Sequence, residues 1–341
     1  MPSSSAAAPG PKGDVDERVR STGRSGAVRW GRPTGSGVGF SPPPIAPLPS
    51  PTADSIPMLE CKEVPRYRVT SVEEIRRLFA KQEPFITEEQ DNPDFQEFAK
   101  ICTAEHIREL WANRDWRVQD FEQTVFDPFV PPVENTAVMP FDTFLERFEN
   151  PIPGRQNYVN IWPTEGTPFA MDFFAKMREF GKKLPLTQPD GQDLKTLWLG
   201  GKGTITPLHY DTYARSHGTV RGEKLYIFFP PDRHHLKKLE AYPVRTTQGW
   251  WSRIGFGPLD PELFPQLEGT KPWRALCKPG DFVWLPPCWW HHVSIPESPT
   301  ITISATHHDP HSKRYYYHWR MRTTRWLGRR QGVLRKVLAT H

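Results

Sequence analysis

The sequence lacks the features of membrane, secreted and zinc-stabilised proteins. No stretch of its 341 residues approaches the run of roughly 20 apolar residues that a membrane-spanning helix needs, and the N-terminus has no apolar segment like those of secretory signals. The four cysteines, Cys61, Cys102, Cys277 and Cys288, show no CxxC spacing and are too few to staple a chain of this length. We therefore expect an intracellular protein, cytoplasmic or nuclear, without structural zinc and without membrane contact.

The first 57 residues are dominated by Ser, Pro, Gly and Ala, as in PSSSAAAPGPKG and FSPPPIAPLPSPTAD. This composition cannot bury enough apolar surface to offset the entropy lost on folding, so we expect residues 1–57 to form a disordered tail. The tail is basic and rich in Ser and Ala, as organellar transit peptides are. Asp14, Asp16 and Glu17 argue against organellar targeting, because transit peptides contain few acidic residues.

Residues 312–341 carry much of the positive charge. They contain nine Lys and Arg residues and no Asp or Glu, so with a net charge of +5 for the whole chain the remainder is net negative. Aromatic and basic residues alternate at roughly helical spacing, which predicts a basic helical C-terminal extension. It can cover the folded domain, pair with a second copy of the chain in a homodimer, or stack on nucleic acid. To test these alternatives, the first residues to replace by neutral ones are Arg322, Arg325, Arg329 and Arg330.

The first part of the region between the tails, residues 58–311, shows helical patterns. The segment 68–87 predicts an amphipathic helix with Ser71 as its N-cap, followed by a short extended stretch. The segments 141–150 and 167–183 also look helical. We expect these helices to pack against the outside of another structure.

From Leu197 onward the pattern changes to short strands rich in β-branched and aromatic residues, separated by Pro and Gly turns. The strand segments are TLWLGG, LYIFFPP, DFVWLPP, HHVSI and TITISAT. This succession favours a mainly β fold, a β-barrel or double-stranded β-helix with flanking α-helices, over a parallel α/β sheet.

Two segments carry residues that can bind a metal ion. In ITPLHYDTY, His209 and Asp211 are two residues apart in a strand pattern, so both side chains point to the same side. In KPGDFVWLPPCWWHHVSI, His291 and His292 offer a third ligand. Two imidazoles and one carboxylate on one face of a metal leave the other positions open, as in non-haem Fe(II) oxygenases. An HxD pair alone is weak, because a buried His often pairs with an Asp for structural reasons.

With these motifs the sequence resembles the JmjC oxygenases, and among them the small hydroxylases of the hypoxia-factor asparaginyl hydroxylase type. The resemblance covers about residues 63–309 and is strongest over 197–231 and 278–306. It implies the cupin or jelly-roll form of the double-stranded β-helix, with a JmjC/cupin-like catalytic domain over residues 58–311.

The family motif implies that iron(II) is held by His209, Asp211 and His291, which leaves His292 pointing to the other face of its strand. It also implies 2-oxoglutarate as co-substrate, whose outer carboxylate needs a cation. Lys224 in TVRGEKLYIFFPP aligns with the lysine of the family's GxK pattern. A solvent-exposed lysine at a strand end is the alternative interpretation.

Further co-substrate contacts are implied by the same resemblance. Thr206 and Tyr158 match family positions whose hydroxyls reach the outer carboxylate, although a plain strand threonine and a core aromatic are the alternatives. Arg215 and Thr306 stand where the asparaginyl hydroxylase type has Asn, so hydrogen bonds around co-substrate or substrate must differ. We keep Thr306 as a candidate for binding the co-substrate. The substrate of the asparaginyl hydroxylase type is not assigned to this protein.

Three aromatic residues near the motif, Trp289, Trp290 and Phe282, are expected to shield the metal site, although aromatic core packing alone would explain them as well. The reaction that the resemblance implies is hydroxylation of a protein side chain, with release of succinate and CO2. Demethylation of N-methyl-lysine is less favoured, because the chain shows no zinc-binding or chromatin-reader module. Hydroxylation of an RNA base stays open through the basic extension. A cupin-like interaction module without turnover is the alternative from another class, against which the intact triad and Lys224 argue.

Overall fold

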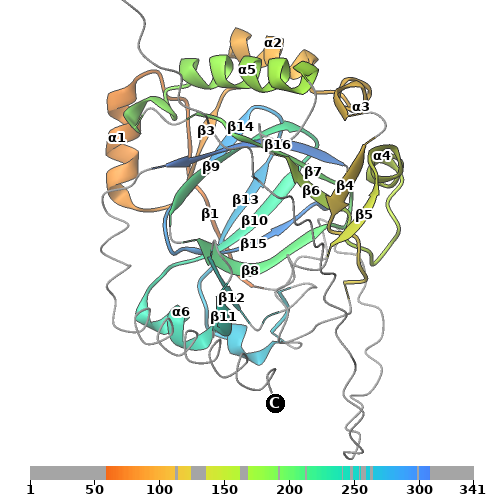
Figure 1. The fold of residues 1–341 in the computed structure, drawn as a ribbon. Helices are drawn as coiled ribbons and strands as arrows, with labels where there is room; N and C mark the ends of the chain where they lie inside the picture. The colour runs from red at the N-terminus through yellow and green to blue at the C-terminus, as the bar shows by residue number, and fades with distance from the viewer. Residues whose placement is uncertain are drawn as a thin grey trace, which may run out of the picture. The chain divides into compact units, whose positions relative to one another are not determined.

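Two seven-stranded β-sheets form the centre of the structure, a computed structural model that describes residues 59–307 with internal gaps (Figure 1). The expected N-terminal tail, residues 1–57, and C-terminal extension, residues 312–341, lie outside the described residues. The gaps are 112–113, 124–135, 162–167, 191–192, 212, 240, 246–248, 253, 255–258, 262–263 and 298.

The first sheet contains the strands that carry the HxD motif and the distal histidines. In spatial order its strands are β1 (Lys62–Glu63), β13 (Trp273–Cys277), β10 (Lys224–Phe229), β15 (Trp290–Ser294), β8 (Ile205–Asp211), β12 (Gly249–Ser252) and β11 (Ala241–Arg245).

The second sheet faces the first. In spatial order its strands are β2 (Arg66–Tyr67), β3 (Phe85–Glu88), β14 (Asp281–Leu285), β9 (Ala214–Arg221), β16 (Thr300–His307), β7 (Thr196–Gly200) and β6 (Tyr158–Ile161). A separate two-stranded sheet pairs β4 (Asp115–Val118) with β5 (Ala137–Pro140).

The chain alternates between the two large sheets. The strands β8, β9 and β10 lie in the first, second and first sheet, and β13, β14, β15 and β16 alternate in the same way. Apart from the short β1 and β2, the strands of both large sheets pair antiparallel. This winding is that of a double-stranded β-helix, so the predicted mainly β jelly-roll with flanking helices is confirmed.

The helices flank this β structure. They are α1 (Val72–Lys81), α2 (Pro93–Lys100), α3 (Ala104–Trp111), α4 (Phe141–Glu149), α5 (Pro168–Lys183) and α6 (Arg233–Lys238), with short 3-10 helices at Gln188–Asp190 and Pro265–Leu267. The predicted N-cap Ser71 accepts a hydrogen bond from the Glu74 amide, and the Glu74 carboxylate accepts one from the Ser71 amide in return. In the described part of the chain, no helix is long and apolar enough to cross a membrane.

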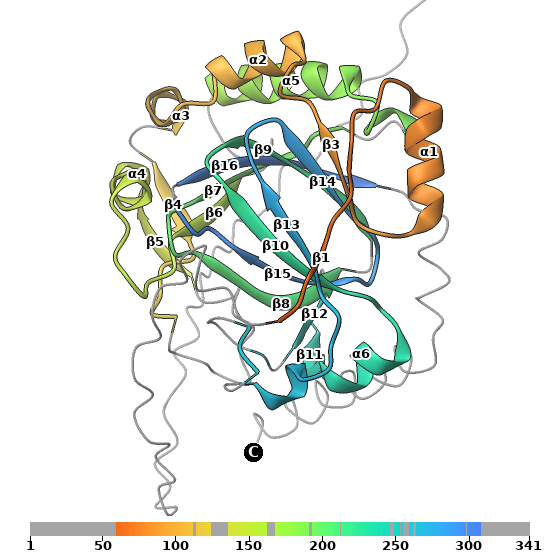
Figure 2. The ribbon, with the colours of Figure 1, turned by 180° about the vertical axis from the view of Figure 1, so that it is seen from behind.

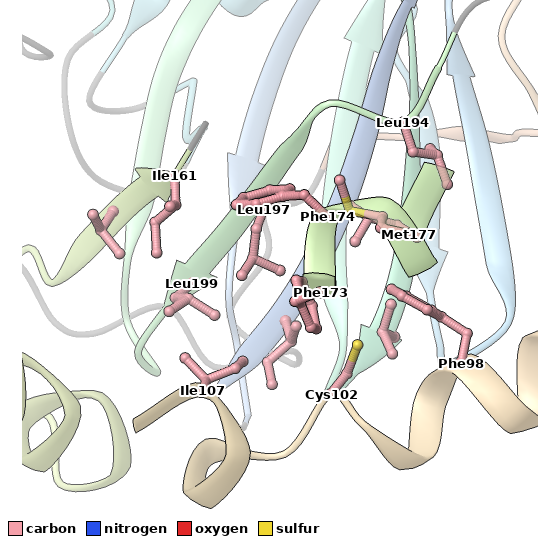
Figure 3. Close-up of a cluster of buried hydrophobic side chains, with 14 of the residues drawn as sticks. Phe98, Cys102, Ile107, Ile161, Phe173, Phe174, Met177, Leu194, Leu197 and Leu199 are labelled. Carbon is pink, nitrogen blue, oxygen red and sulfur yellow. The ribbon is translucent and has the colours of Figure 1, made fainter. Parts of the chain in front are cut away.

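The outer face of the second sheet is covered by helices. Figures 1 and 2 show α2 and α5 side by side above this sheet. Leu197 and Leu199 of β7 point into the layer between sheet and helices, where they meet Phe173 of α5 and Phe98 of α2 (Figure 3). Because the strand alternates, Trp198 between the two leucines points to the opposite, inner face.

The inner faces, the sides of the two sheets that face each other, differ along their length. At one end, apolar side chains from both sheets, including Phe228 of β10 and Val283 of β14, pack into a hydrophobic cluster. Toward the other end the inner faces carry buried polar side chains, such as His217, Lys224 and His291. The three candidate metal ligands and Lys224 lie on these polar parts of the inner faces.

Candidate metal centre and the polar inner faces

Three side chains that can bind a metal converge on the inner face of the first sheet. His209 and Asp211 lie on β8, and His291 lies directly opposite His209 on the neighbouring strand β15. One donor atom from each of the three residues lies within 4.8 Å of those of the other two, and the two imidazole centroids are 4.0 Å apart. The two motifs, about 80 residues apart, therefore meet because β8 and β15 pair in this register.

A β-bulge sets the direction of Thr206. His291 pairs with His209, but Val293, two residues on, pairs with Thr206, three residues back, so β8 has one extra residue in this interval. Paired residues share a face, and Val293 belongs to the inner apolar cluster. Thr206 therefore faces inward together with His209, although simple alternation would place it outward.

Both histidines are held as neutral rings with a defined tautomer. Nδ1 of His209 lies 2.9 Å from the Pro207 carbonyl, and Nδ1 of His291 lies 3.0 Å from the Trp289 carbonyl. A carbonyl only accepts, so each Nδ1 carries the proton and each Nε2 keeps its lone pair for a metal. Burial lowers the pKa of both rings, and for His209 the neighbouring His291 lowers it further. The donor set therefore suits a divalent cation.

Asp211 is fixed through both its backbone and its side chain. The Cys288 amide donates a 2.7 Å hydrogen bond to the Asp211 carbonyl, which ties β8 to the turn before β15. Nε of Arg215 lies 3.0 Å from the Asp211 carboxylate, and the Arg215 and Asp211 side chains are only 6% and 12% exposed. The carboxylate thus points inward next to a buried cation.

The neighbours of His291 on its strand point elsewhere. His292 pairs with Ile227, whose side chain packs in the cluster behind the first sheet, so His292 faces away from His209. Trp290 lies in the same outer cluster against Tyr210, with ring centroids 4.6 Å apart. The expectation that Trp290 shields the metal site is therefore wrong, because strand alternation puts it opposite His291.

Phe282 does not shield the site either. Its ring packs on Phe95 and Phe180 in the layer under the helices, on the outer face of the second sheet. Trp289 does lie on the inner side, but it packs with Trp273 in the apolar cluster and donates its indole hydrogen to the Gln82 carbonyl. Of the three aromatic residues, only Trp289 faces the interior.

Lys224 lies buried among aromatic rings at the start of β10. Its ammonium donates a 3.0 Å hydrogen bond to the Tyr158 hydroxyl and stands 5.3 Å and 6.0 Å from the ring centroids of Tyr158 and Trp198. No carboxylate of the described residues lies within ion-pair distance, and burial lowers the pKa of Lys224 to about 7. The structure thus brings Lys224 and Tyr158 together and, among the described residues, gives the lysine no counter-charge.

Several polar atoms beside Lys224 also lack partners. Nε2 of His217 and the hydroxyls of Thr219 and Thr302 are buried without a hydrogen-bond partner among the residues the structure describes. Thr219 and Thr302 are paired across β9 and β16, and Nδ1 of His217 lies within hydrogen-bond distance of the Tyr226 hydroxyl, at 3.2 Å. Buried polar atoms are rarely left unpaired, so these groups fit a polar ligand.

The two positions that depart from the family pattern are neighbours. Thr306 of β16 pairs directly with Arg215 of β9, so both side chains occupy the same face. The Arg215 guanidinium also donates to the Tyr213 hydroxyl and lies over the Tyr213 ring, 4.8 Å from its centroid. Thr306 thus lies beside Arg215, whose guanidinium contacts the candidate metal ligand Asp211.

Sequence reasoning missed the inward row of β9. It noted Arg215 only as a departure and did not consider His217 or Thr219. The signal was present in ARSHGTVR, where every second residue from Arg215 to Thr219 is polar, as expected of a strand with one polar face. The sequence could not predict that these side chains are buried, because the strands that cover them belong to the opposite sheet and are distant in sequence.

The family comparison agrees with this geometry. A profile of the family described as Cupin-like domain matches residues 70–313. Jumonji C domain-containing protein 5 of Drosophila melanogaster is 35% identical over 117 residues, which are 34% of this chain and 28% of that protein. The match therefore shows similarity over part of each chain.

Two further relatives carry the names of enzymes. The Arabidopsis thaliana protein named lysine-specific demethylase JMJ32 is 28% identical over 123 residues, 29% of this chain and 36% of its own. The human protein named bifunctional peptidase and (3S)-lysyl hydroxylase JMJD7 is 29% identical over 121 residues, 30% of this chain and 37% of its own. In each case this chain spans less than half of the relative's length. Because the profile spans well over half of the sequence, this chain belongs to the cupin-like domain family, with relatives that carry JmjC names.

Proposed function

We propose that this protein is an Fe(II)- and 2-oxoglutarate-dependent dioxygenase that hydroxylates a protein side chain. One observation carries the proposal: the inner faces of one jelly-roll hold three metal-binding donors and, on the neighbouring strand β10, a buried lysine without a counter-charge among the described residues. A metal site alone would also suit a binding module. A metal site together with an unpaired buried cation suits a chelating carboxylate ligand.

The donors fit iron(II). His209, Asp211 and His291 would hold the metal through two neutral nitrogens and one carboxylate oxygen, a set that leaves open positions for other ligands. Bound there, Fe(II) would supply the activation of dioxygen and the oxidation of a substrate C–H bond while 2-oxoglutarate is converted to succinate and CO2. The protein holds both rings in one tautomer through the Pro207 and Trp289 carbonyls.

The residues around Lys224 fit the outer carboxylate of 2-oxoglutarate. Lys224 would pair with it, and a carboxylate would restore the charged form that burial disfavours. Burial raises the pKa of Tyr158 well above its usual range, so its phenol stays protonated and can donate a hydrogen to the same carboxylate. Thr206 faces the same interior. These residues bind and orient, and none of them needs to change its covalent structure.

A protein substrate is supported by the names of relatives rather than by geometry. One relative is named a lysyl hydroxylase and another a lysine-specific demethylase, so both reactions on lysine are candidates for this chain. Hydroxylation is the proposal, and demethylation is the second candidate. Two alternatives remain if the experiment below gives no product from peptides: hydroxylation of an RNA base, and an interaction module that has no catalytic activity.

The test is a reconstitution assay. Protein loaded anaerobically with Fe(II) receives 2-oxoglutarate and oxygen, and succinate is quantified for the wild type and for His209→Ala and His291→Ala. We expect succinate from the wild type, even slowly without substrate, and none above background from the variants. A wild type that binds no iron, or that yields no succinate with any peptide library offered, would overturn the proposal.

Hydroxylation and demethylation are separated by their products. Incubation with peptide libraries that contain unmodified or N-methylated lysine is followed by mass spectrometry and by a formaldehyde assay. The proposed hydroxylase adds one oxygen atom to an unmodified peptide and releases no formaldehyde. Formaldehyde with loss of a methyl group would replace hydroxylation by the second candidate.

A further inference from the structure

The turn before β15 contains one of the two non-glycine residues of the described chain that have a positive φ. Gln82, at φ 56°, ends α1, where a left-handed residue is common. Cys288, at φ 67°, lies instead in the turn formed by residues 286–289, three residues before the candidate ligand His291. A residue with a Cβ atom is strained in this conformation, so the surrounding structure must hold it there.

The turn has the pattern of a type II β-turn. The Trp289 amide donates a 3.4 Å hydrogen bond to the Pro286 carbonyl, with Pro287 at the second position and Cys288 at the third. Proline is favoured at the second position, and the third needs a positive φ and therefore favours glycine. In a type I turn the third residue has a negative φ, and the peptide group between the two central residues is turned over. The positive φ of Cys288 therefore goes with one direction of its own amide N–H.

This amide and the next carbonyl contact two of the three candidate metal ligands. The Cys288 amide donates a 2.7 Å hydrogen bond to the Asp211 carbonyl, and a turned-over peptide group would point away from it. The Trp289 carbonyl accepts the proton of Nδ1 of His291 at 3.0 Å. One turn thus holds Asp211 on β8 and His291 on the paired strand β15.

Contacts from two directions hold the turn in place. The Cys288 side chain is buried in the apolar cluster behind the first sheet, together with Tyr210 and Trp290. The Trp289 indole donates a 2.9 Å hydrogen bond to the Gln82 carbonyl at the end of α1. Glycine at position 288 would take the same φ without strain, but it would leave the space of the thiol in the cluster empty.

We propose that Cys288 is a positioning residue of the metal centre: its left-handed backbone directs its amide to Asp211 and the following carbonyl to His291, and so sets how the two ligands stand to each other. The thiol is not a ligand itself, because it lies behind the sheet whereas the three donors face the interior. The inference rests on the metal site of the proposed function, and it concerns metal binding without any co-substrate.

The experiment measures Mn(II) affinity by electron paramagnetic resonance, and urea unfolding gives the stability of the same proteins. Cys288→Gly removes the thiol and keeps the left-handed backbone accessible. Cys288→Val keeps an apolar side chain of similar size, but a β-branched residue disfavours positive φ. Cys102→Val is the matched control, because Cys102 is likewise buried, in the apolar layer between the second sheet and its helices, and its φ is not positive. Circular dichroism verifies folding of each variant.

We expect folded Cys288→Val to bind Mn(II) at least about tenfold more weakly than the wild type, because the turn can no longer direct both contacts. Cys288→Gly should stay within about threefold of the wild type, which makes glycine the rescuing substitution. Cys102→Val should change the stability and leave the Mn(II) affinity as it is. A purely structural role of Cys288 would give the same result for Cys288→Val as for Cys102→Val.

Two results overturn the inference and leave the proposed function intact. Wild-type affinity in folded Cys288→Val would mean that the conformation of the turn does not set the ligands. A loss beyond about threefold in Cys288→Gly would mean that packing of the thiol, and not the backbone, sets them. The second result is available even if Cys288→Val does not fold. A wild type that binds no Mn(II) overturns the proposed function and the inference together.

Discussion

The two faces of the second sheet are made by the same strands and have opposite properties. Toward the helices, β7 presents Leu199, which Figure 3 labels, and β16 presents Ile301 and Ile303; all three are fully buried in an apolar layer. Toward the first sheet, the same strands present Trp198 and Thr302, beside Lys224. One residue along a strand thus separates a packed core from a polar interior.

The outer face stabilises the fold, whereas the inner face lowers the stability of the ligand-free protein. A buried leucine contributes about 1.5–3 kcal/mol through its apolar surface. A buried hydroxyl or amine without a partner is destabilising by about 1–3 kcal/mol. Among the described residues Lys224 is buried without a counter-charge and the Thr302 hydroxyl without a hydrogen-bond partner, so these two side chains do not serve folding. The comparison therefore locates function on the inner face independently of any motif.

The largest expected effect comes from the same comparison made on the first sheet, where β15 carries two adjacent histidines that point to opposite faces. His291→Ala removes a donor from the inner face, and we expect loss of measurable Mn(II) binding because only two of the three donors remain. His292→Ala changes the opposite face of β15 and should keep binding. Isothermal titration calorimetry measures the Mn(II) affinity of both folded variants. Equal loss in both would mean that the two faces do not separate as the register indicates.

The second prediction concerns the apolar, helix-covered face of the second sheet. Leu199→Ala should lower the free energy of unfolding by about 2–5 kcal/mol, because it leaves a cavity between sheet and helices. Urea unfolding measures the loss. Mn(II) affinity of the folded variant should equal that of the wild type, since Leu199 points away from the metal ligands. A weakened metal site in the folded variant would show that the outer layer also positions the donors.

The third prediction concerns pH and Lys224. Its pKa is lowered to about 7 in the folded protein by burial, whereas an unfolded lysine keeps its ordinary value of 10.5. Between these values the unfolded state binds more protons, so the stability of the ligand-free protein rises with pH by up to about 1.4 kcal/mol per unit. The penalty of burying the charge grows as pH falls from 10.5 to about 7 and is constant below.

Urea unfolding at pH 7, 8 and 9 tests this slope by comparison of the wild type with Lys224→Met. The variant should be more stable than the wild type at pH 7, and the difference should shrink as pH rises. Lys202→Met, a change at a half-exposed lysine paired with Glu297, is the control and should show a constant difference. A pH-independent difference for Lys224→Met would mean that the ammonium is charged in the folded protein over the whole range.

The smallest effects come from two inward hydroxyls of β16. Thr302→Val replaces an unpaired buried hydroxyl and should stabilise the ligand-free protein by about 1 kcal/mol. Ser304→Ala should destabilise it by about 1 kcal/mol, because the Ser304 hydroxyl accepts the hydrogen bond of the Trp198 indole at 2.8 Å. Thermal unfolding of the two variants shows whether each change in stability is positive or negative. Destabilisation by both would indicate that Thr302 is satisfied in solution.

Much of the local structure follows from sequence. Ser71 with Glu74 three residues on has the pattern of a capping box, and that cap is present in the structure. The β-rich segments from Leu197 onward are strands, and alternation places His209 and Asp211 on one face. These features depend on neighbours in the chain, so the order of side chains determines them.

Other features depend on how distant strands meet. The bulge in β8 turns Thr206 inward against simple alternation, and the outward turn of Phe282 and Trp290 overrides their proximity in sequence to His291. Arg215 reaches Asp211 because β8 and β9 lie in opposite sheets and face each other across the interior.

The sequence by itself determined the strand-rich fold class, the capped helix and the ligand pair on β8, because local geometry and alternation suffice for them. Only the tertiary structure decided that β15 brings His291 opposite His209, that Lys224 is buried without a counter-charge from any described residue, and that Arg215 pairs with Asp211. Burial and charge partnership are properties of the closed interior, and two facing sheets must be assembled before either exists.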